Sequence, residues 1–126
     1  MRPQTLAEVA RLASSGESFD HCLANFLDEF YAAPSALALA DVPALLAPAR
    51  WELGQVQDAY LAAAAEELAR DQNFPIPAWV AAETRQLRRP WFASPLAAVR
   101  AVLLLESPAA FRARNLFVSG NALTRV

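Results

Sequence analysis

The sequence predicts an all-α protein, a compact bundle of about five or six helices with an irregular C-terminal tail. Of the 126 residues, 56% are hydrophobic and only three are glycine, a composition that favours helix over a β-sandwich or disorder. Apolar residues recur with a helical period in four segments. The length suits a single helical domain, residues 1–126, able to bury about two thirds of its unfolded surface.

The first two helices are predicted at residues 5–15 and 18–32. Thr5 and Glu8 form a capping-box pattern at the start of the first apolar stripe. The second segment has a strong helical period, and Pro34 ends it. Its apolar face carries Phe19, Leu23, Phe26, Leu27 and Phe30.

Residues 33–50 contain three prolines and are expected to form a packed loop with a helical turn after Asp41. The longest helix is predicted over residues 50–71. Its one apolar face is expected to contain Leu53, Val56, Tyr60, Leu61, Ala64 and Leu68. An extended connector follows at 73–77, and its last proline begins a short helix that carries Trp79.

The most apolar segment, from Leu96 to Leu105, is expected to form the central core helix. The pairs Ser94-Pro95 and Ser107-Pro108 are typical of helix starts, because serine caps the first N–H groups and proline suits the first helical position. Apolar side chains cover nearly the whole circumference, which is typical of a buried helix. Arg100 is the one interior charge. Its head either meets a carboxylate of another helix or lies inside an apolar docking surface.

The C-terminal end, residues 115–126, is expected to hold a short extended piece at 116–118 and a turn at 119–121. A continuous apolar run of this kind needs a cover. We expect the protein's own core to cover part of it, and a partner or a second copy to cover the rest.

The residues that could carry chemistry form no catalytic or metal-binding pattern. His21 and Cys22 are the only residues of their types and point in different directions on a helix. Glu17, His21 and Asp28 share a helix face, but they lack the further ligand that a closed site needs. Glycine-rich phosphate loops and hydrolase motifs are absent from the sequence. We expect no enzymatic activity, no metal and no cofactor.

A single cysteine excludes an intramolecular disulfide, and no apolar run reaches the length of a membrane span. A cytoplasmic protein without membrane contact is therefore expected. The charge is uneven: residues 1–75 carry a net charge of −7 and residues 76–126 a net charge of +5. Such a split favours either contact between the two halves or a basic face for an acidic partner.

Arginine and aromatic residues gather in the basic half, and together they are typical of protein interfaces. The candidate partner-binding residues are Arg85, Arg88, Arg89, Trp91, Phe92, Arg100, Arg112, Arg114 and Phe117. An alternative is a DNA-binding transcriptional regulator, in which the same arginines pair with phosphates and the aromatic rings stack on bases. The net charge of −2 and the lack of a helix-turn-helix turn speak against DNA.

Three stretches carry a resemblance to a known family: SFDHCLANFLDEFY, DAYLAAAAEELARDQNFPIPAWV, and the C-terminal stretch from PWFASP to the end. They resemble a family of small uncharacterised bacterial proteins over nearly the whole chain. The resemblance implies a two-gene module similar to a toxin–antitoxin pair, beside a nucleotidyltransferase-like partner. It assigns no individual residue. We expect a non-catalytic, antitoxin-like protein-binding module whose partner is a toxin or a second copy.

Overall fold

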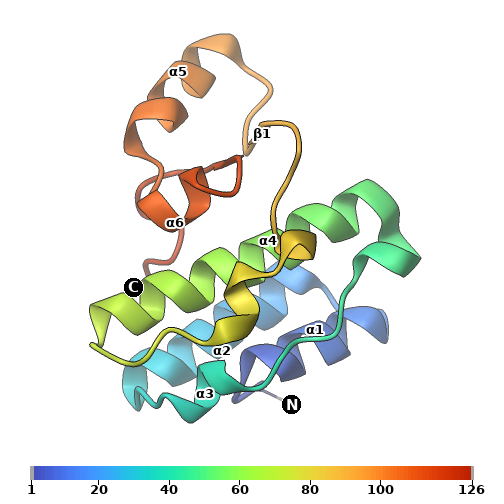
Figure 1. Ribbon diagram of the computed structural model, residues 1–126, viewed down its shortest axis with the longest axis vertical. Helices are drawn as coiled ribbons and strands as arrows, with labels where there is room; N and C mark the ends of the chain where they lie inside the picture. Colours follow the sequence, from blue (N-terminus) through green and yellow to red (C-terminus); the bar gives the residue numbers. More distant parts are fainter. Residues whose placement is uncertain (1, 126) are drawn as a thin grey trace.

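The computed structural model describes residues 2–125 and confirms the all-α prediction (Figure 1). Its helices are α1 (Leu6–Ser14), α2 (Phe19–Ala32), α3 (Leu37–Ala40), α4 (Ala47–Asp71), α5 (Ala97–Glu106) and α6 (Ala109–Arg112). Two 3₁₀ turns, η1 (Ala78–Ala81) and η2 (Glu83–Arg85), follow α4. In the sequence, the strand β1 (Trp91–Phe92) precedes α5 and α6, and the strand β2 (Leu116–Phe117) follows them.

Local signals place the first two helices as predicted. The Thr5 hydroxyl accepts the Glu8 N–H at 3.1 Å, and the Ser18 hydroxyl accepts the His21 N–H at 3.2 Å. Each bond satisfies one of the free N–H groups at a helix start. The predicted apolar face of α2 is buried throughout: Phe19, Leu23, Phe26, Leu27 and Phe30.

Helix α4 contributes side chains to two hydrophobic cores, whereas the sequence predicted a single apolar face. Toward α1 and α2 it contributes Leu61, Ala62, Ala65, Leu68 and Ala69. Toward α6 and β2 it contributes Val56, Ala59 and Ala63. Leu53, expected on the apolar face, is 56% exposed. The run of alanines lets neighbours approach the α4 backbone on both sides, so α4 separates the N-terminal helices from the C-terminal segment in Figure 1.

The first turn of α4, residues 47–50, is separated by a kink from the rest of the helix and lies close to it. Trp51 has a positive φ of 54°, which separates a first turn from the rest of α4. A Cβ built on Gly54 would lie 2.6 Å from backbone atoms of Leu46 and Ala47, so only glycine fits this close approach. The helical turn expected after Asp41 is this first turn of α4, residues 47–50, and the short helix α3 lies before Asp41.

The C-terminal segment is built on a parallel strand pair. Trp91 is paired with Leu116 and Phe92 with Phe117, and α5 and α6 form the connection between the strands. The extended piece predicted at 116–118 is therefore present as β2. Neither Ser-Pro pair caps a helix as predicted: the N-cap residues are Leu96 and Pro108. The Ser94 hydroxyl accepts the Leu96 N–H at 3.2 Å, which forms a turn ahead of α5.

The prediction that α5 is the central core helix is wrong. Among its side chains only Leu103 is buried, whereas Leu105 is 84% exposed and Val102 is 51% exposed. Figure 1 shows α5 at the end of the molecule far from α1, α2 and α3, with α6 between it and α4. The other apolar side chains of α5 are exposed in the described part of the chain, residues 2–125.

The C-terminal run needs no partner, contrary to the prediction that one would cover part of it. Leu116, Phe117 and Val118 are all buried within the chain's own fold. The tail beyond them lies against α2, where the Tyr31 hydroxyl donates to the Leu123 carbonyl at 2.7 Å. Within residues 2–125, no helix is both long enough and apolar enough to cross a bilayer.

Candidate protein-docking surface

The exposed side of α5 is an unbroken apolar surface. At 100° per residue, six positions lie on the side of the helix opposite to the buried Leu103, and all six are exposed. We call them the α5 outer face: Ala97, Ala98, Ala101, Val102, Leu104 and Leu105. None of them is polar. The charged residues Arg100 and Glu106 lie on opposite edges, one on each side of Leu103.

Polar contacts at its C-terminal end hold α5 in place despite its single buried side chain. The Ser107 hydroxyl accepts the Val118 N–H at 2.9 Å and lies 2.6 Å from the Leu103 carbonyl. The Glu106 carboxylate accepts the Gly120 N–H at 3.1 Å. Arg112 donates to the Ser107 carbonyl at 2.9 Å and satisfies a group that the helix end leaves free. These contacts hold α5 against the rest of the fold and leave its outer face exposed.

Arg100 lies at the rim of this face. Its Nε donates to the Ser94 carbonyl at 3.3 Å, and its guanidinium lies 5.1 Å from the centre of the Phe92 ring. Phe92 stacks in turn on Phe117, with 5.0 Å between the ring centres. Among the described residues, no carboxylate lies within ion-pair distance of Arg100. The first alternative for Arg100, a carboxylate of another helix, is therefore wrong within this chain.

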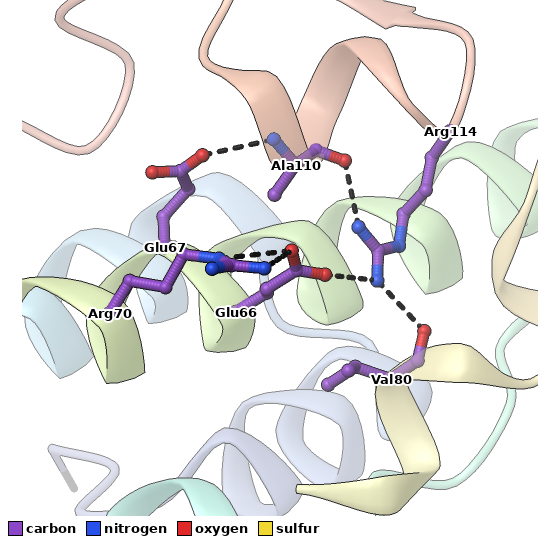
Figure 2. A network of polar contacts seen from close by, with 6 residues as sticks. All are labelled: Glu66, Glu67, Arg70, Val80, Ala110 and Arg114. Atoms are coloured by element: carbon purple, nitrogen blue, oxygen red, sulfur yellow. Dashed lines mark hydrogen bonds and ion pairs between the residues drawn. The ribbon is translucent and has the colours of Figure 1, made fainter. Parts of the chain in front are cut away.

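Arg114 was predicted to bind a partner, but it is buried and its contacts lie within the fold. It donates to Glu66 at 2.9 Å, to the Ala110 carbonyl at 2.7 Å and to the Val80 carbonyl at 2.9 Å (Figure 2). Burial acts to raise the pKa of the Glu66 carboxyl, but hydrogen bonds from Arg114 and Arg70 outweigh it and hold that pKa below its usual value. The network joins α4, η1 and α6.

Glu67 extends the network in Figure 2 to the start of α6. Its carboxylate accepts the Ala110 N–H at 3.0 Å, as a side-chain cap would. Phe117, another predicted partner contact, is likewise buried, with 8% of its surface exposed. Because neither Arg114 nor Phe117 reaches the surface, neither can meet a partner in this fold.

Arg85 is also buried, and its expected role in partner binding is wrong for the same reason. It lies 3.8 Å from the Asp58 carboxylate, donates to the Pro43 carbonyl, and stacks 5.0 Å from the Trp79 ring. Asp58 accepts the Leu46 N–H at 2.7 Å and caps the first turn of α4. Burial raises the pKa of the Asp58 carboxyl and lowers the pKa of the Arg85 guanidinium, so desolvation outweighs the attraction between them.

The remaining predicted residues lie at or near the surface. Arg88, Arg89, Arg100 and Arg112 are exposed, and within residues 2–125 none of the four forms an ion pair. Trp91 and Phe92 are half-buried. The basic excess of the C-terminal half is therefore only partly neutralised inside the fold. Of these four arginines without an ion pair in residues 2–125, Arg100 lies on α5 and Arg112 on α6, whereas Arg88 and Arg89 lie just before β1.

A second feature is an open groove of about 1000 Å³ between the start of α4 and residues 83–91. Trp51, which is 81% exposed, lines one wall, and Trp91 lines the other. We call it the tryptophan groove. Glu52 lies on the α4 wall, and Glu83, Arg88 and Arg89 lie on the opposite wall. The sequence reasoning missed Trp51, although a tryptophan outside the apolar stripe of its helix was the available signal.

The described residues contain no group of three potential metal ligands close enough to hold an ion. Cys22 is buried, and burial raises the pKa of its thiol, which makes the reactive thiolate scarce. His21 is exposed on α2. The two exposed features described above are the α5 outer face and the tryptophan groove.

Comparisons of the chain with protein-family models, with curated proteins and with solved structures found no match.

Proposed function

We propose that the protein is a non-catalytic protein-binding module, an antitoxin-like neutraliser that docks on a partner protein through the α5 outer face. One observation carries the proposal: a ten-residue helix holds its place through its polar C-terminal end while its apolar side faces water. Contiguous exposed apolar surface on a folded protein typically marks an interaction site. Isolated exposed apolar residues elsewhere on the chain do not form such a helix-long face.

The unpaired arginines define the chemistry of the partner. Arg100 and Arg112 lie on and beside α5, and a guanidinium prefers the bidentate geometry of a carboxylate. The partner surface is therefore an apolar groove with carboxylates along its rim, a helix-in-groove mode of recognition. The resemblance to proteins of two-gene modules points to the product of the adjoining gene, a nucleotidyltransferase-like protein. We place this interaction in the cytoplasm, where an unpaired buried cysteine is ordinary.

Co-purification with the product of the adjoining gene tests this proposal. The wild-type chain is expected to co-purify in a stoichiometric complex. A Val102→Asp/Leu105→Asp double variant is expected to lose the complex, because two charges would enter the apolar interface. Leu37→Asp is the matched control: Leu37 is 78% exposed on α3, far from α5, and its variant keeps the complex.

Circular dichroism first establishes that the double variant remains helical, as both side chains are exposed. A folded double variant that still co-purifies at wild-type yield would contradict docking through α5. Loss of the complex in Leu37→Asp would place the interface on the N-terminal helices instead.

The structure gives less support to the alternative, DNA binding, than the sequence did. It relied on the C-terminal arginines, and two of them, Arg85 and Arg114, have their guanidinium groups inside the protein. The net charge of −2 repels a polyanion at long range. Because the α5 outer face contains no basic side chain, we do not propose a nucleic-acid partner.

A further inference from the structure

We propose that, without another partner, the α5 outer face is covered by the tryptophan groove of a second copy of this chain. The contact is reciprocal: each α5 enters the groove of the other copy, which gives a closed two-fold dimer. This inference rests on the proposed function, because both place an occupant on the same face of α5. It adds the identity of the occupant in the free protein.

The groove and the helix match in size. A ten-residue helix is about 15 Å long. The volume of the open groove, about 1000 Å³, is comparable with that of the exposed half of such a helix, about 600–850 Å³ for a diameter of about 10–12 Å. The alanines at 97, 98 and 101 leave room for the large indole rings that line the groove walls.

The apolar surfaces of the two features are complementary. Trp51 is among the most exposed large side chains of the protein, and its positive φ of 54° is rare for an aromatic residue. The fold therefore holds a tryptophan in an unusual backbone conformation with most of its ring in water. Leu105 is equally exposed on α5. Contact between them buries both, and tryptophans in such pockets typically dominate the energy of an interface.

The charges on the two edges of α5 are opposite in sign to those on the two walls of the groove. The outer face of α5 has Arg100 on one edge and Glu106 on the other. The groove has Glu52 on the α4 wall, and Glu83, Arg88 and Arg89 on the facing wall, which keeps a net positive charge. One orientation of the helix thus places Arg100 beside Glu52 and Glu106 beside the two arginines. The reversed orientation places like charges together, so the charges select one orientation.

The helix cannot occupy the groove of its own chain. The β1–β2 pairing and the Ser107 hydrogen bonds to Leu103 and Val118 fix α5 against β2, with its outer face turned away from Leu103 and from the rest of the fold. The short links at both ends of α5 leave no chain for a swing to the start of α4. A second copy supplies the same groove without that restriction.

The molar mass in solution, measured by sedimentation equilibrium, tests the inference. The wild-type chain is expected at twice the 13.7 kDa of one chain. Leu105→Asp places a charge on α5, and Trp51→Asp removes the indole and places a charge in the groove. Each variant alone is expected to have the mass of a monomer. Leu37→Asp, on a surface outside both features, stays dimeric.

Mixing the two variants is the decisive step. The Trp51→Asp chain has an intact α5, and the Leu105→Asp chain has an intact groove. A one-to-one mixture is therefore expected to form a heterodimer with one of the two contacts restored, although it needs a higher concentration than the wild type. A dimer in the mixture but in neither variant alone is the signature of exchange between two different surfaces.

Several results would overturn the inference. These are a monomeric wild-type chain, a dimer that survives either substitution, or a mixture that stays monomeric. None of them decides the proposed function, because co-purification with the adjoining gene product is measured separately. Conversely, a dimer that follows this pattern in a chain that never co-purifies with that product would leave the inference standing and remove the antitoxin-like role.

Discussion

Replacing Asp58 with alanine is expected to lower the free energy of unfolding by about 3–5 kcal/mol, the usual cost of breaking one side of a buried ion pair. The variant leaves the Arg85 guanidinium buried without its counter-charge, and it frees the Leu46 and Ala47 N–H groups that the carboxylate accepts. Urea denaturation followed by circular dichroism measures the loss. Gln55→Ala, an exposed change on the same helix, is the control and is expected to change stability little.

A double-mutant cycle separates the pair from its surroundings. Arg85→Met alone leaves the Asp58 charge buried, whereas the double variant removes both charges. Burial raises the pKa of the Asp58 carboxyl and lowers the pKa of the Arg85 guanidinium, so each ion is costly in the interior. The double variant is therefore expected to cost clearly less than the sum of the singles. Additive losses would show that the two side chains act independently.

Deleting residues 115–126 is expected to abolish cooperative unfolding of the C-terminal segment. The deletion removes β2 and the buried side chains of Leu116, Phe117 and Val118, each worth about 1.5–3 kcal/mol of apolar burial. It also exposes Phe111, which packs in the same cluster. Increased binding of a hydrophobic dye and loss of the sharp thermal transition are the expected signals.

A shorter deletion provides the control for this result. A chain that ends at Thr124 loses the Arg125 contact with Asp28, an exposed ion pair that contributes little in water. It is expected to keep the wild-type melting transition. If the chain that ends at Arg114 also kept that transition, the tail would be dispensable and its observed burial would have no energetic role.

The parts of the fold that were predictable from the sequence depend on signals between residues close in the chain. Thr5 and Ser18 cap N–H groups three residues ahead, and the apolar period of α2 spans only a few turns. Because these interactions join residues of the same helix or its cap, the nearby sequence is enough to predict them. The helices α1 and α2 and the extended connector after α4 were therefore predictable.

The placement of α5 was not predictable, because an apolar pattern says that a helix needs a cover and not which surface provides it. A helix that is apolar all round is usually a core helix. Here α4 already fills the central position, since its alanines pack against neighbours on both sides. Among the described residues 2–125, Leu103 is therefore the only α5 side chain that is buried.

The buried arginines were hidden from sequence reasoning for a related reason. Arg85 and Arg114 reach carboxylates and backbone carbonyls that lie 27 to 48 residues away in the chain. Backbone carbonyl acceptors leave no mark in a sequence, and the acidic partners look like any helix carboxylate. Arg88, Arg89, Arg100 and Arg112 form no ion pair within residues 2–125 and stay at the surface. The basic character of the segment was therefore predictable, but which of its arginines are buried was not.

The reactivity of a cysteine at position 105 tests most directly whether the α5 outer face is open in a single chain and covered by association. In Leu105→Cys, the new thiol lies at a position that is 84% exposed, while the native Cys22 is buried and serves as the slow internal reference. Its labelling by a maleimide is expected to be as fast as that of a free thiol in dilute protein, and to slow as the protein concentration rises. Slow labelling at every concentration would show that α5 is packed inside its own chain, and fast labelling at every concentration would show that no second copy covers it.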